Sequence, residues 1–209
     1  MRLDHVSYVA SHDQISDVVN RIGSQIGTAF IDGGIHPKFG TRNFTAPLLN
    51  GQYIEIVCPL DHPATDATPF GQAVKKKADA GGGWMAWILA SSDIDTLENG
   101  LNKKAVEGLR KKPNGQILQW KQIGVTDMLD DARKPFYVQW LSNEHPSMDG
   151  LPHSKLAEIV INGEKSDEIK KILDNLTLDV NLTFISLPDL EVGIKEIIFE
   201  FDKKLISIN

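Results

Sequence analysis

The sequence predicts an α+β fold in which βαβββ modules form one curved mixed sheet around a cavity. Hydrophobic residues alternate with period two in some segments and follow helical spacing in others. The same order of these segments restarts after about eighty residues, which indicates an internal repeat. With 209 residues, 41% of them hydrophobic, the chain can bury a substantial core.

The first module spans about residues 1–60 and opens with an alternating strand over residues 2–10. Ser11 and Gln14 match a capping box, which predicts that a helix begins there and ends at Gly27. One apolar stripe follows that helix, at Ile15, Val18, Val19, Ile22 and Ile26. Three extended runs come next, at residues 28–35, 41–49 and 52–58, with glycine-containing turns between them.

A second module covers about residues 83–145. Residues 84–90 form its first strand, and Ser91, Ser92 and Asp93 are suitable caps for a helix that carries Ile94 and Leu97. Extended runs follow at residues 116–124 and 136–141. The two modules together predict a domain over residues 1–150.

Two further segments complete the chain. Residues 61–82 are rich in Pro, Ala, Gly and Lys and indicate a connector with one helical turn. Residues 151–209 predict an abbreviated third βα module, packed on the same body, whose last strand lies near residues 196–201.

Composition excludes several classes of function. A net charge of -6 argues against nucleic-acid binding, and the short basic runs 75–77 and 110–112 are typical of solvated faces. The single cysteine, Cys58, lies in an apolar strand and is expected in the core. We find neither a signal-peptide pattern nor an apolar run of about 18 residues, so we expect a cytoplasmic protein without a membrane segment.

The candidate site begins with His5 on the first strand and Glu55 on the fourth. Each is a polar residue at an alternating position of an apolar run, so each points to one face of the sheet. Alternation places Ser7 beside His5 and Tyr53 beside Glu55 on that concave face. A histidine and a glutamate on two strands make up half of a metal site, and without a metal they can form a charge-assisted hydrogen bond.

Several short segments of the first 150 residues share a pattern with a known family. They are residues 3–6, 33–43, 53–56, 83–87 and 135–140, followed by His145 and Pro146. In this order, the sequence resembles the glyoxalase-like domain family of the vicinal oxygen chelate superfamily. The resemblance implies paired modules, with metal ligands supplied by the first and fourth strands of both. It also implies chemistry of the lyase, isomerase or dioxygenase type.

The second module departs from the metal-binding pattern of that superfamily. Aligned on the first module, it places Met85 and Gln139 at the ligand positions, and a thioether and an amide oxygen are weak ligands for divalent ions. A metal such as Mn, Fe, Ni or Zn would be held by His5, Glu55 and Gln139, with a further ligand from His36 or His145. The metal-free alternative is a direct pairing of His5 with Glu55.

The remaining predicted pocket residues lie on one face of the second module and on a loop. Alternation puts Met85, Trp87, Tyr137 and Gln139 on the concave face, where Trp87 and Tyr137 either form pocket walls or fill the barrel. The loop supplies His36, Arg42 and Asn43, of which Arg42 is best suited to a carboxylate.

The sequence therefore predicts a protein that binds a small oxygen-rich or aromatic molecule between the two modules, as an enzyme or as an enzyme relic. The alternative is a metal-free binding or resistance-type protein without catalysis. A third interpretation is an assembly protein, because an unpaired third module would leave a strand edge or face that a homodimer covers.

Overall fold

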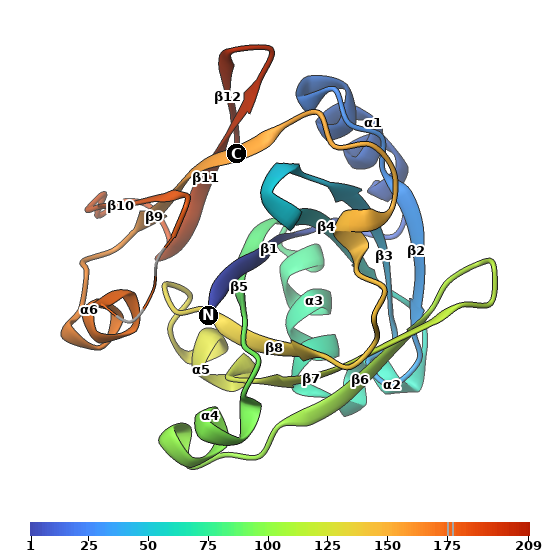
Figure 1. The fold of residues 1–209 in the computed structure, drawn as a ribbon, viewed down its shortest axis with the longest axis horizontal. Helices are drawn as coiled ribbons and strands as arrows, with labels where there is room; N and C mark the ends of the chain where they lie inside the picture. Colours follow the sequence, from blue (N-terminus) through green and yellow to red (C-terminus); the bar gives the residue numbers. More distant parts are fainter. Residues whose placement is uncertain (175, 177) are drawn as a thin grey trace.

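The computed structural model describes residues 1–174, 176 and 178–209, and its main body is a closed eight-stranded barrel (Figure 1). The first module supplies β1 (Arg2–Val9), β2 (Ile31–His36), β3 (Thr41–Pro47) and β4 (Tyr53–Pro59). The second supplies β5 (Gly83–Ala90), β6 (Val106–Lys111), β7 (Ile117–Ile123) and β8 (Phe136–Trp140). The curved mixed sheet of two modules is confirmed, and β6 is a strand that the sequence pattern did not reveal.

The two modules have the same internal pairing. Around the barrel the order is β1, β4, β3, β2, β6, β7, β8, β5. The first strand of each module runs parallel to its fourth, β1 beside β4 and β5 beside β8. The modules join along the antiparallel β1–β5 pair and, at the other side, through Ile35 of β2 and Lys111 of β6.

Each module has a helix after its first strand, α1 (Ile15–Ile26) and α4 (Ile94–Leu101). The predicted capping box is wrong, because the N-cap of α1 is Gln14 and its side chain makes no capping hydrogen bond. Asp93 caps α4 as predicted, accepting a hydrogen bond from the backbone N–H of Thr96 at 3.0 Å. Gly27 ends α1 in the left-handed conformation, and a Cβ there would come within 2.1 Å of the Phe201 ring.

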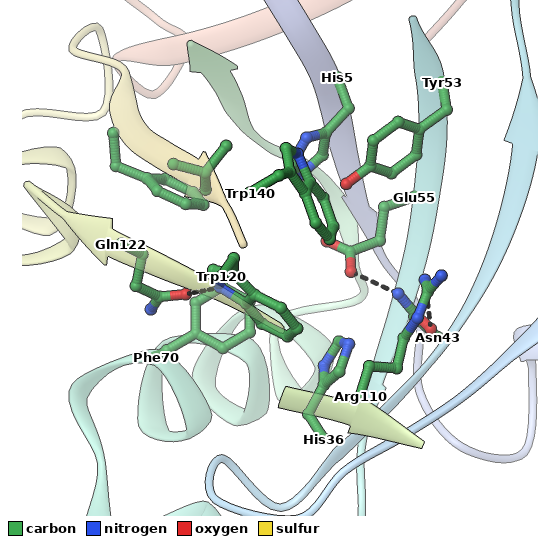
Figure 2. Close-up of a pocket in the computed structure, with 12 residues that line it drawn as sticks. His5, His36, Asn43, Tyr53, Glu55, Phe70, Arg110, Trp120, Gln122 and Trp140 are labelled. Atoms are coloured by element: carbon green, nitrogen blue, oxygen red, sulfur yellow. Dashed lines mark hydrogen bonds between the residues drawn. The ribbon is translucent and has the colours of Figure 1, made fainter. Parts of the chain in front are cut away.

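The connector holds more helix than the predicted single turn. It contains α2 (Pro63–Ala67) and α3 (Pro69–Asp79), and each begins with a proline, which is well tolerated at the first helical position. Helix α3 lies across the barrel in Figure 1. Its Phe70 and Val74 pack with interior residues such as Val57, and Phe70 reaches the cavity shown in Figure 2.

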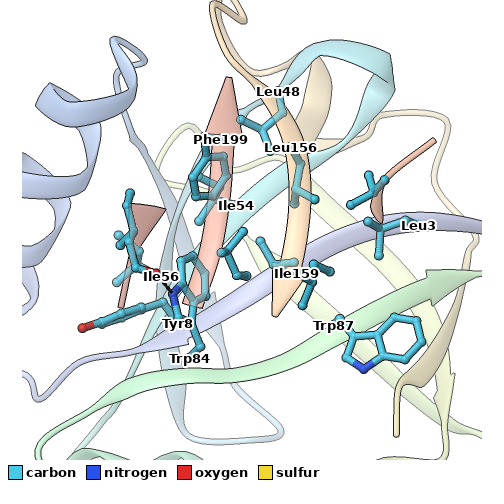
Figure 3. Packing of buried hydrophobic residues seen from close by; sticks show 14 of the residues in the cluster. Leu3, Tyr8, Leu48, Ile54, Ile56, Trp84, Trp87, Leu156, Ile159 and Phe199 are labelled. Carbon is cyan, nitrogen blue, oxygen red and sulfur yellow. Dashed lines mark hydrogen bonds between the residues drawn. The ribbon is translucent and has the colours of Figure 1, made fainter. Parts of the chain in front are cut away.

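The outer face of the barrel packs against the C-terminal segment. Val6, Ile54 and Trp84 belong to one buried cluster with Leu156 and Phe199, part of which is drawn in Figure 3. Each large apolar side chain fully buried in this way stabilises the fold by about 1.5–3 kcal/mol. The indole N–H of Trp84 also donates to the backbone carbonyl of residue 208 at 2.7 Å. The third module is therefore packed on the barrel.

The C-terminal segment is larger than a βα unit. It contains β9 (Lys155–Asn162), α6 (Asp167–Asp174), β10 (Asn181–Ile185), β11 (Gly193–Phe201) and β12 (Lys204–Ile208). Its strands form a separate sheet in the order β10, β9, β11, β12. This order differs from that of the barrel modules. Within a barrel module the first strand pairs only with the fourth, whereas β9 pairs with two strands of its own segment, parallel with β10 and antiparallel with β11.

Three short helices complete the structure: η1 (Leu49–Gly51), α5 (Val125–Asp130) and η2 (Pro146–Met148). Over the described part of the chain, the helices fall short of the length and apolar character that a membrane crossing requires.

Candidate functional site

A cavity of about 420 Å³, which includes its open mouth, lies inside the barrel (Figure 2). One group of lining residues is polar: His5, His36, Asn43, Tyr53, Glu55 and Arg110. The second group is mostly apolar: Phe70, Trp120, Gln122, Phe136, Val138 and Trp140. The first module and β6 supply the polar side, and the second module with α3 supplies the apolar side.

Five of the residues predicted for the site line this cavity: His5, His36, Asn43, Tyr53 and Glu55. Ser7 lies behind them, where it is buried and donates a hydrogen bond to Glu55 at 2.8 Å. The predicted alternation of β1 and β4 is confirmed, because Val9 and Val57 are interior whereas Val6 and Ile54 pack in the outer cluster.

The structure does not bring Arg42 to the cavity. Its side chain is on the outer face of β3, where it pairs with Asp32 and lies over the Phe44 ring at 5.5 Å. The alternation of β3 explains this placement, since Thr41 and Asn43 point inward and Arg42 therefore points outward.

The predicted pocket residues of β5 and β8 also lie outside the cavity. Trp87 and Tyr137 belong to the outer cluster, and the Trp87 indole donates to the carbonyl of Arg133 at 3.0 Å. Gln139 binds the start of α4, accepting from the Ile94 N–H at 3.3 Å and donating to the carbonyl of residue 92. The predicted orientation of β8 was wrong by one residue.

Met85 is displaced by an irregularity in the β1–β5 ladder. Ser7 pairs with Ala86 whereas Tyr8 pairs with Trp84, so Met85 is the extra residue of a bulge. Its side chain lines a groove beside α3 and α5 instead of the cavity. A bulge shifts every later residue by one position, and the sequence pattern gave no sign of it.

Register identifies the true counterparts of the metal-ligand positions in the second module. His5 pairs with Tyr53 across β1 and β4, and Ile88 pairs with Phe136 across β5 and β8. Two residues further along the fourth strands lie Glu55 and Val138. Ile88 and Val138 thus replace the second pair of ligands with hydrocarbon.

These donors do not fit a catalytic metal ion. In the described residues, no three His, Cys, Asp or Glu side chains form a group that could hold a metal. Gln139 points away, and the second module contributes apolar side chains, whereas a catalytic zinc or iron site uses at least three protein ligands. The predicted metal set of His5, Glu55 and Gln139 is not assembled.

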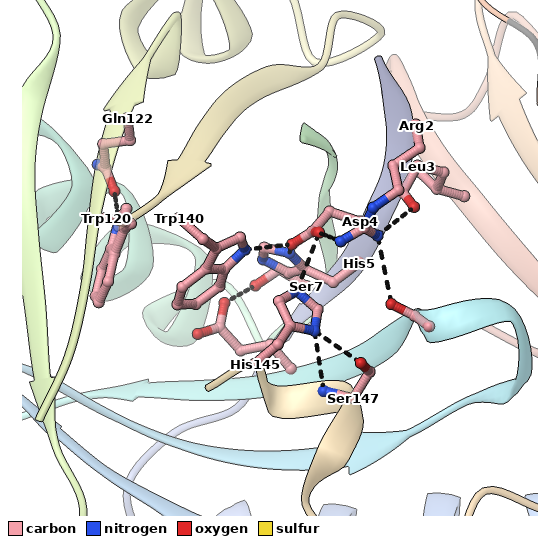
Figure 4. A network of polar contacts seen from close by, with 12 residues as sticks. Arg2, Leu3, Asp4, His5, Ser7, Trp120, Gln122, Trp140, His145 and Ser147 are labelled. Carbon is pink, nitrogen blue, oxygen red and sulfur yellow. Dashed lines mark hydrogen bonds and ion pairs between the residues drawn. The ribbon is translucent and has the colours of Figure 1, made fainter. Parts of the chain in front are cut away.

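His5 is instead held by Asp4, its neighbour in the chain (Figure 4). Nδ1 of His5 lies 3.0 Å from Oδ2 of Asp4, and the ring stacks on Tyr53 with 4.3 Å between centroids. A carboxylate only accepts hydrogen bonds, so the proton of neutral His5 sits on Nδ1. The lone pair is then on Nε2, the nitrogen available to a ligand.

Asp4 is a buried carboxylate with several donors. In addition to the hydrogen bond from His5, Asp4 accepts hydrogen bonds from the Trp140 indole and from Nε2 of His145, each at 3.1 Å. Asp4 also forms an ion pair with Arg2 at 2.8 Å. Burial alone would raise the pKa of Asp4, but the hydrogen bonds and charges of His145 and His5 hold it well below its ordinary value. Asp4 therefore stays ionised and fixes the orientation of both histidines.

Glu55 is also buried, with both oxygens occupied. It accepts from Asn43 at 2.7 Å and from Ser7 at 2.8 Å. Burial raises its pKa, but the charges of His5 and His36 and these two hydrogen bonds outweigh burial and leave the pKa below its ordinary value. Glu55 is thus an ionised group whose negative charge is fixed at the cavity wall.

His36 and Tyr53 are the buried neighbours of this carboxylate. Burial, together with the charges of Arg110 and His5, lowers the pKa of His36 to about 4 against the opposing effect of Glu55. Burial raises the pKa of Tyr53 well above its ordinary value, helped by the charges of Asp4 and Glu55. The phenol consequently keeps its proton and can donate it to a ligand oxygen.

Arg110 is a cavity residue that the sequence pattern did not reveal. It lies in a basic run expected to be solvated, but the side chain is 2% exposed and lines the cavity. Its Nη1 donates weakly to Asn43 at 3.4 Å, and the nearest carboxylate, Asp149, is 3.9 Å from Nη2. Nε and Nη2 have no hydrogen-bond partner among the described residues. A buried guanidinium with unpaired donors is suited to an anionic ligand.

Gly33 on β2 leaves the space that Arg110 occupies. A Cβ at this position would lie 2.2 Å from Oδ1 of Asn43 and 2.8 Å from Nη1 of Arg110. These distances are far below van der Waals contact. Gly33 lies inside strand β2, and its missing side chain allows Asn43 and Arg110 to meet.

The apolar side of the cavity comes from alternate residues of β7 and β8 and from Phe70. Trp120 and Trp140 lie 5.7 Å apart between ring centroids, and Trp120 donates to Gln122 at 2.8 Å. Both tryptophans contact histidines of the site, Trp120 with His36 and Trp140 with His145. Trp120 and Trp140 are aromatic walls of the cavity, whereas Trp87 and Tyr137, predicted for this role, lie outside it.

Comparisons with known proteins agree with this architecture. The sequence profile of the family described as "Glyoxalase-like domain" matches residues 3–177. No curated protein has a significant match to the chain. A hypothetical protein from Staphylococcus aureus superposes with a TM-score of 0.60 at 17% identity, over 100% of this chain and 85% of that one. This likeness shows a shared fold.

Two epimerases superpose over a smaller part. Methylmalonyl-CoA epimerase from Mycobacterium tuberculosis has a TM-score of 0.43 at 12% identity, over 66% of this chain and 85% of its own. A Streptomyces coelicolor methylmalonyl-CoA epimerase, solved in complex with 2-nitronate-propionyl-CoA, has a TM-score of 0.43 at 13% identity, over 69% of this chain and 99% of its own. The family match covers most of the chain, and the barrel has the expected paired modules. The chain belongs to the glyoxalase-like domain family.

Proposed function

We propose that this protein binds a small organic carboxylate in the barrel cavity, with the carboxylate at Arg110 and the apolar part of the ligand against Trp120 and Trp140. The observation that carries the proposal is the buried Arg110 guanidinium, whose Nε and Nη2 lack hydrogen-bond partners among the described residues. A buried guanidinium with unsatisfied N–H donors is costly, and an anionic ligand would offset that cost.

The polar side of the cavity supports proton transfer on such a ligand. Nε2 of His5 is the basic nitrogen of a ring oriented by Asp4, the arrangement that serves general bases. With a 2-oxo acid, a C–H bond next to the carbonyl would break and its proton would move to Nε2. The electron pair would pass to the carbonyl oxygen, which the protonated Tyr53 can stabilise. The reaction class is isomerisation or lysis through an enolate.

The binding claim is tested by calorimetric titration with benzoate. We expect binding in the wild type and a loss of affinity of about tenfold or more in Arg110→Met, because a charge-assisted hydrogen bond is removed. Arg42→Met is the matched control, since Arg42 lies on β3, which only β2 separates from β6, but its side chain points outward. Benzamide, which has a similar shape and no charge, should bind as weakly to wild type as benzoate binds to Arg110→Met. Equal benzoate affinity in the wild type and in Arg110→Met contradicts the proposal.

A second candidate is binding without catalysis, and one observation favours it. Both oxygens of Glu55 already accept hydrogen bonds and its pKa is lowered, so Glu55 is a weak base and cannot assist His5 in moving protons. Deuterium exchange into 2-oxobutanoate separates the two candidates. Exchange at C3 that the protein accelerates and that His5→Gln abolishes supports the enzyme. Binding of 2-oxobutanoate without accelerated exchange supports the metal-free binding protein.

A further inference from the structure

A second cavity adjoins the site. It encloses about 550 Å³, including its mouth, and its walls include Phe39, Val106, Ile123 and Val125. Phe70 and Gln122 line both cavities and so form the wall between them. The second cavity is therefore an extension of the ligand site beyond this wall.

The charged residues at the rim of the second cavity are already paired. Lys103 contacts Asp127 at 2.6 Å, and Lys104 contacts Glu98 at 2.7 Å. The walls are otherwise largely apolar. This cavity lacks a buried, unpaired donor comparable to Arg110 in the part of the chain that the structure describes. Its chemistry suits an uncharged hydrocarbon group and not a second anion.

Strand β6 connects the two cavities along one face. Every second residue of β6 points to the same side of the strand, which groups Val106, Gly108 and Arg110. Val106 lines the second cavity and Arg110 lines the first. Val106 and Arg110 are four positions apart in an extended strand, so their Cα atoms are roughly 13 Å apart. Between them, Gly108 makes room for Trp120, because a Cβ at this position would lie 2.4 Å from the indole ring. An extended ligand along β6 would run beside this indole.

We propose that the second cavity binds the alkyl tail of the ligand whose carboxylate pairs with Arg110, with the tail passing between Phe70 and Gln122. The inference rests on the proposed function and narrows it. The ligand class becomes medium-chain amphipathic carboxylic acids instead of short acids. The carboxylate end of the ligand contacts His5 and Arg110. The alkyl end fills the apolar second cavity, about four residues further along strand β6.

The test is calorimetry with butanoate, hexanoate, octanoate and decanoate. In the wild type we expect affinity to rise by about fourfold for each added methylene, as burial of a CH₂ group predicts, until the second cavity is full. Val106→Trp fills that cavity from a half-exposed position, so it should keep the affinity for butanoate and lose most of the gain for octanoate. Leu109→Trp is the matched control, because Leu109 is on the opposite face of β6 and should leave both affinities unchanged.

The outcomes separate the two proposals. Affinity that depends on Arg110 but not on chain length overturns the tail site and leaves the proposed function standing. A second outcome is that affinity rises with chain length, that Val106→Trp removes this rise, and that Arg110→Met leaves butanoate binding unaffected. This result supports the tail site and contradicts the anion site. A gain with chain length that Val106→Trp leaves intact overturns the tail site. Absence of binding for all four acids contradicts both proposals.

Discussion

Nδ1 of His5 lies 3.0 Å from Oδ2 of Asp4, the preceding residue in the same strand. Neighbouring strand residues normally point to opposite faces, so this contact requires a break in the alternation. The β1–β5 ladder supplies it, with a register shift between Leu3 and His5. The shift turns Asp4 to the cavity side, where it also meets Trp140 and His145.

Asp4→Asn should destabilise the protein substantially. The amide turns one acceptor into a donor and removes the negative charge, so at least one of the four donors around residue 4 loses its partner. We expect a loss of at least about 2 kcal/mol in the free energy of unfolding, measured by urea denaturation. Asp61→Asn, at an exposed bend, is the control and should change it by less than about 0.5 kcal/mol.

Gly33→Ala should weaken carboxylate binding and also destabilise the fold. The new methyl group would overlap Asn43 and Arg110, so both side chains must move from their positions at the cavity wall. Gly100→Ala is the matched control, because a Cβ there meets nothing within 4 Å and the residue lies in α4. That control should stabilise the protein by up to about 1 kcal/mol. Unchanged benzoate affinity in Gly33→Ala would show that the position of Arg110 does not matter for the ligand.

Arg110→Met should make the free protein more stable even though it impairs binding. The substitution keeps an apolar side chain of similar length and removes a buried charge whose Nε and Nη2 have no hydrogen-bond partner in the described residues. We expect the free energy of unfolding to rise by about 1 kcal/mol. A clear loss of stability in Arg110→Met would mean that the guanidinium serves the fold, and it would weaken the case for a ligand site.

Stability should fall as the pH drops from 8 to 5, and His36 should account for much of the fall. Its pKa is about 4 in the folded protein and lies near 6.5 when unfolded. Between these values the unfolded chain binds more protons, so stability is present above pH 6.5 and is lost toward pH 4. The loss between pH 8 and pH 5 is about 2 kcal/mol. His36→Gln should be less sensitive over this range, and an unchanged slope would contradict the assignment.

The sequence was sufficient for the parts of the fold that depend on clear alternation and on turn residues. The first module was predicted with His5, Tyr53 and Glu55 on the cavity side, because His5 and Ser7 share one alternating face of β1 and Tyr53 and Glu55 share one face of β4. The second module was harder. Strand β8 carries Tyr137 and Gln139 on one face, and the opposite, more apolar set of Phe136, Val138 and Trp140 enters the cavity, so the rule that held for β1 and β4 chose the wrong face.

Two features of the site could not be predicted for other physical reasons. The bulges that redirect Asp4 and Met85 depend on how β1 pairs with β5, which is a long-range property. Arg110 was assigned to solvent because basic runs are usually exposed. Its burial depends on closure of the barrel between β2 and β6 and on the space at Gly33.

A crystal structure of the protein with bound benzoate tests the central claim most directly. The account predicts a carboxylate oxygen about 2.7–3.2 Å from Nη2 of Arg110 and the benzene ring against Trp120 and Trp140. Benzoate ordered elsewhere in the barrel, or an Arg110 guanidinium hydrogen-bonded to a protein carboxylate with the cavity free of benzoate, would contradict it.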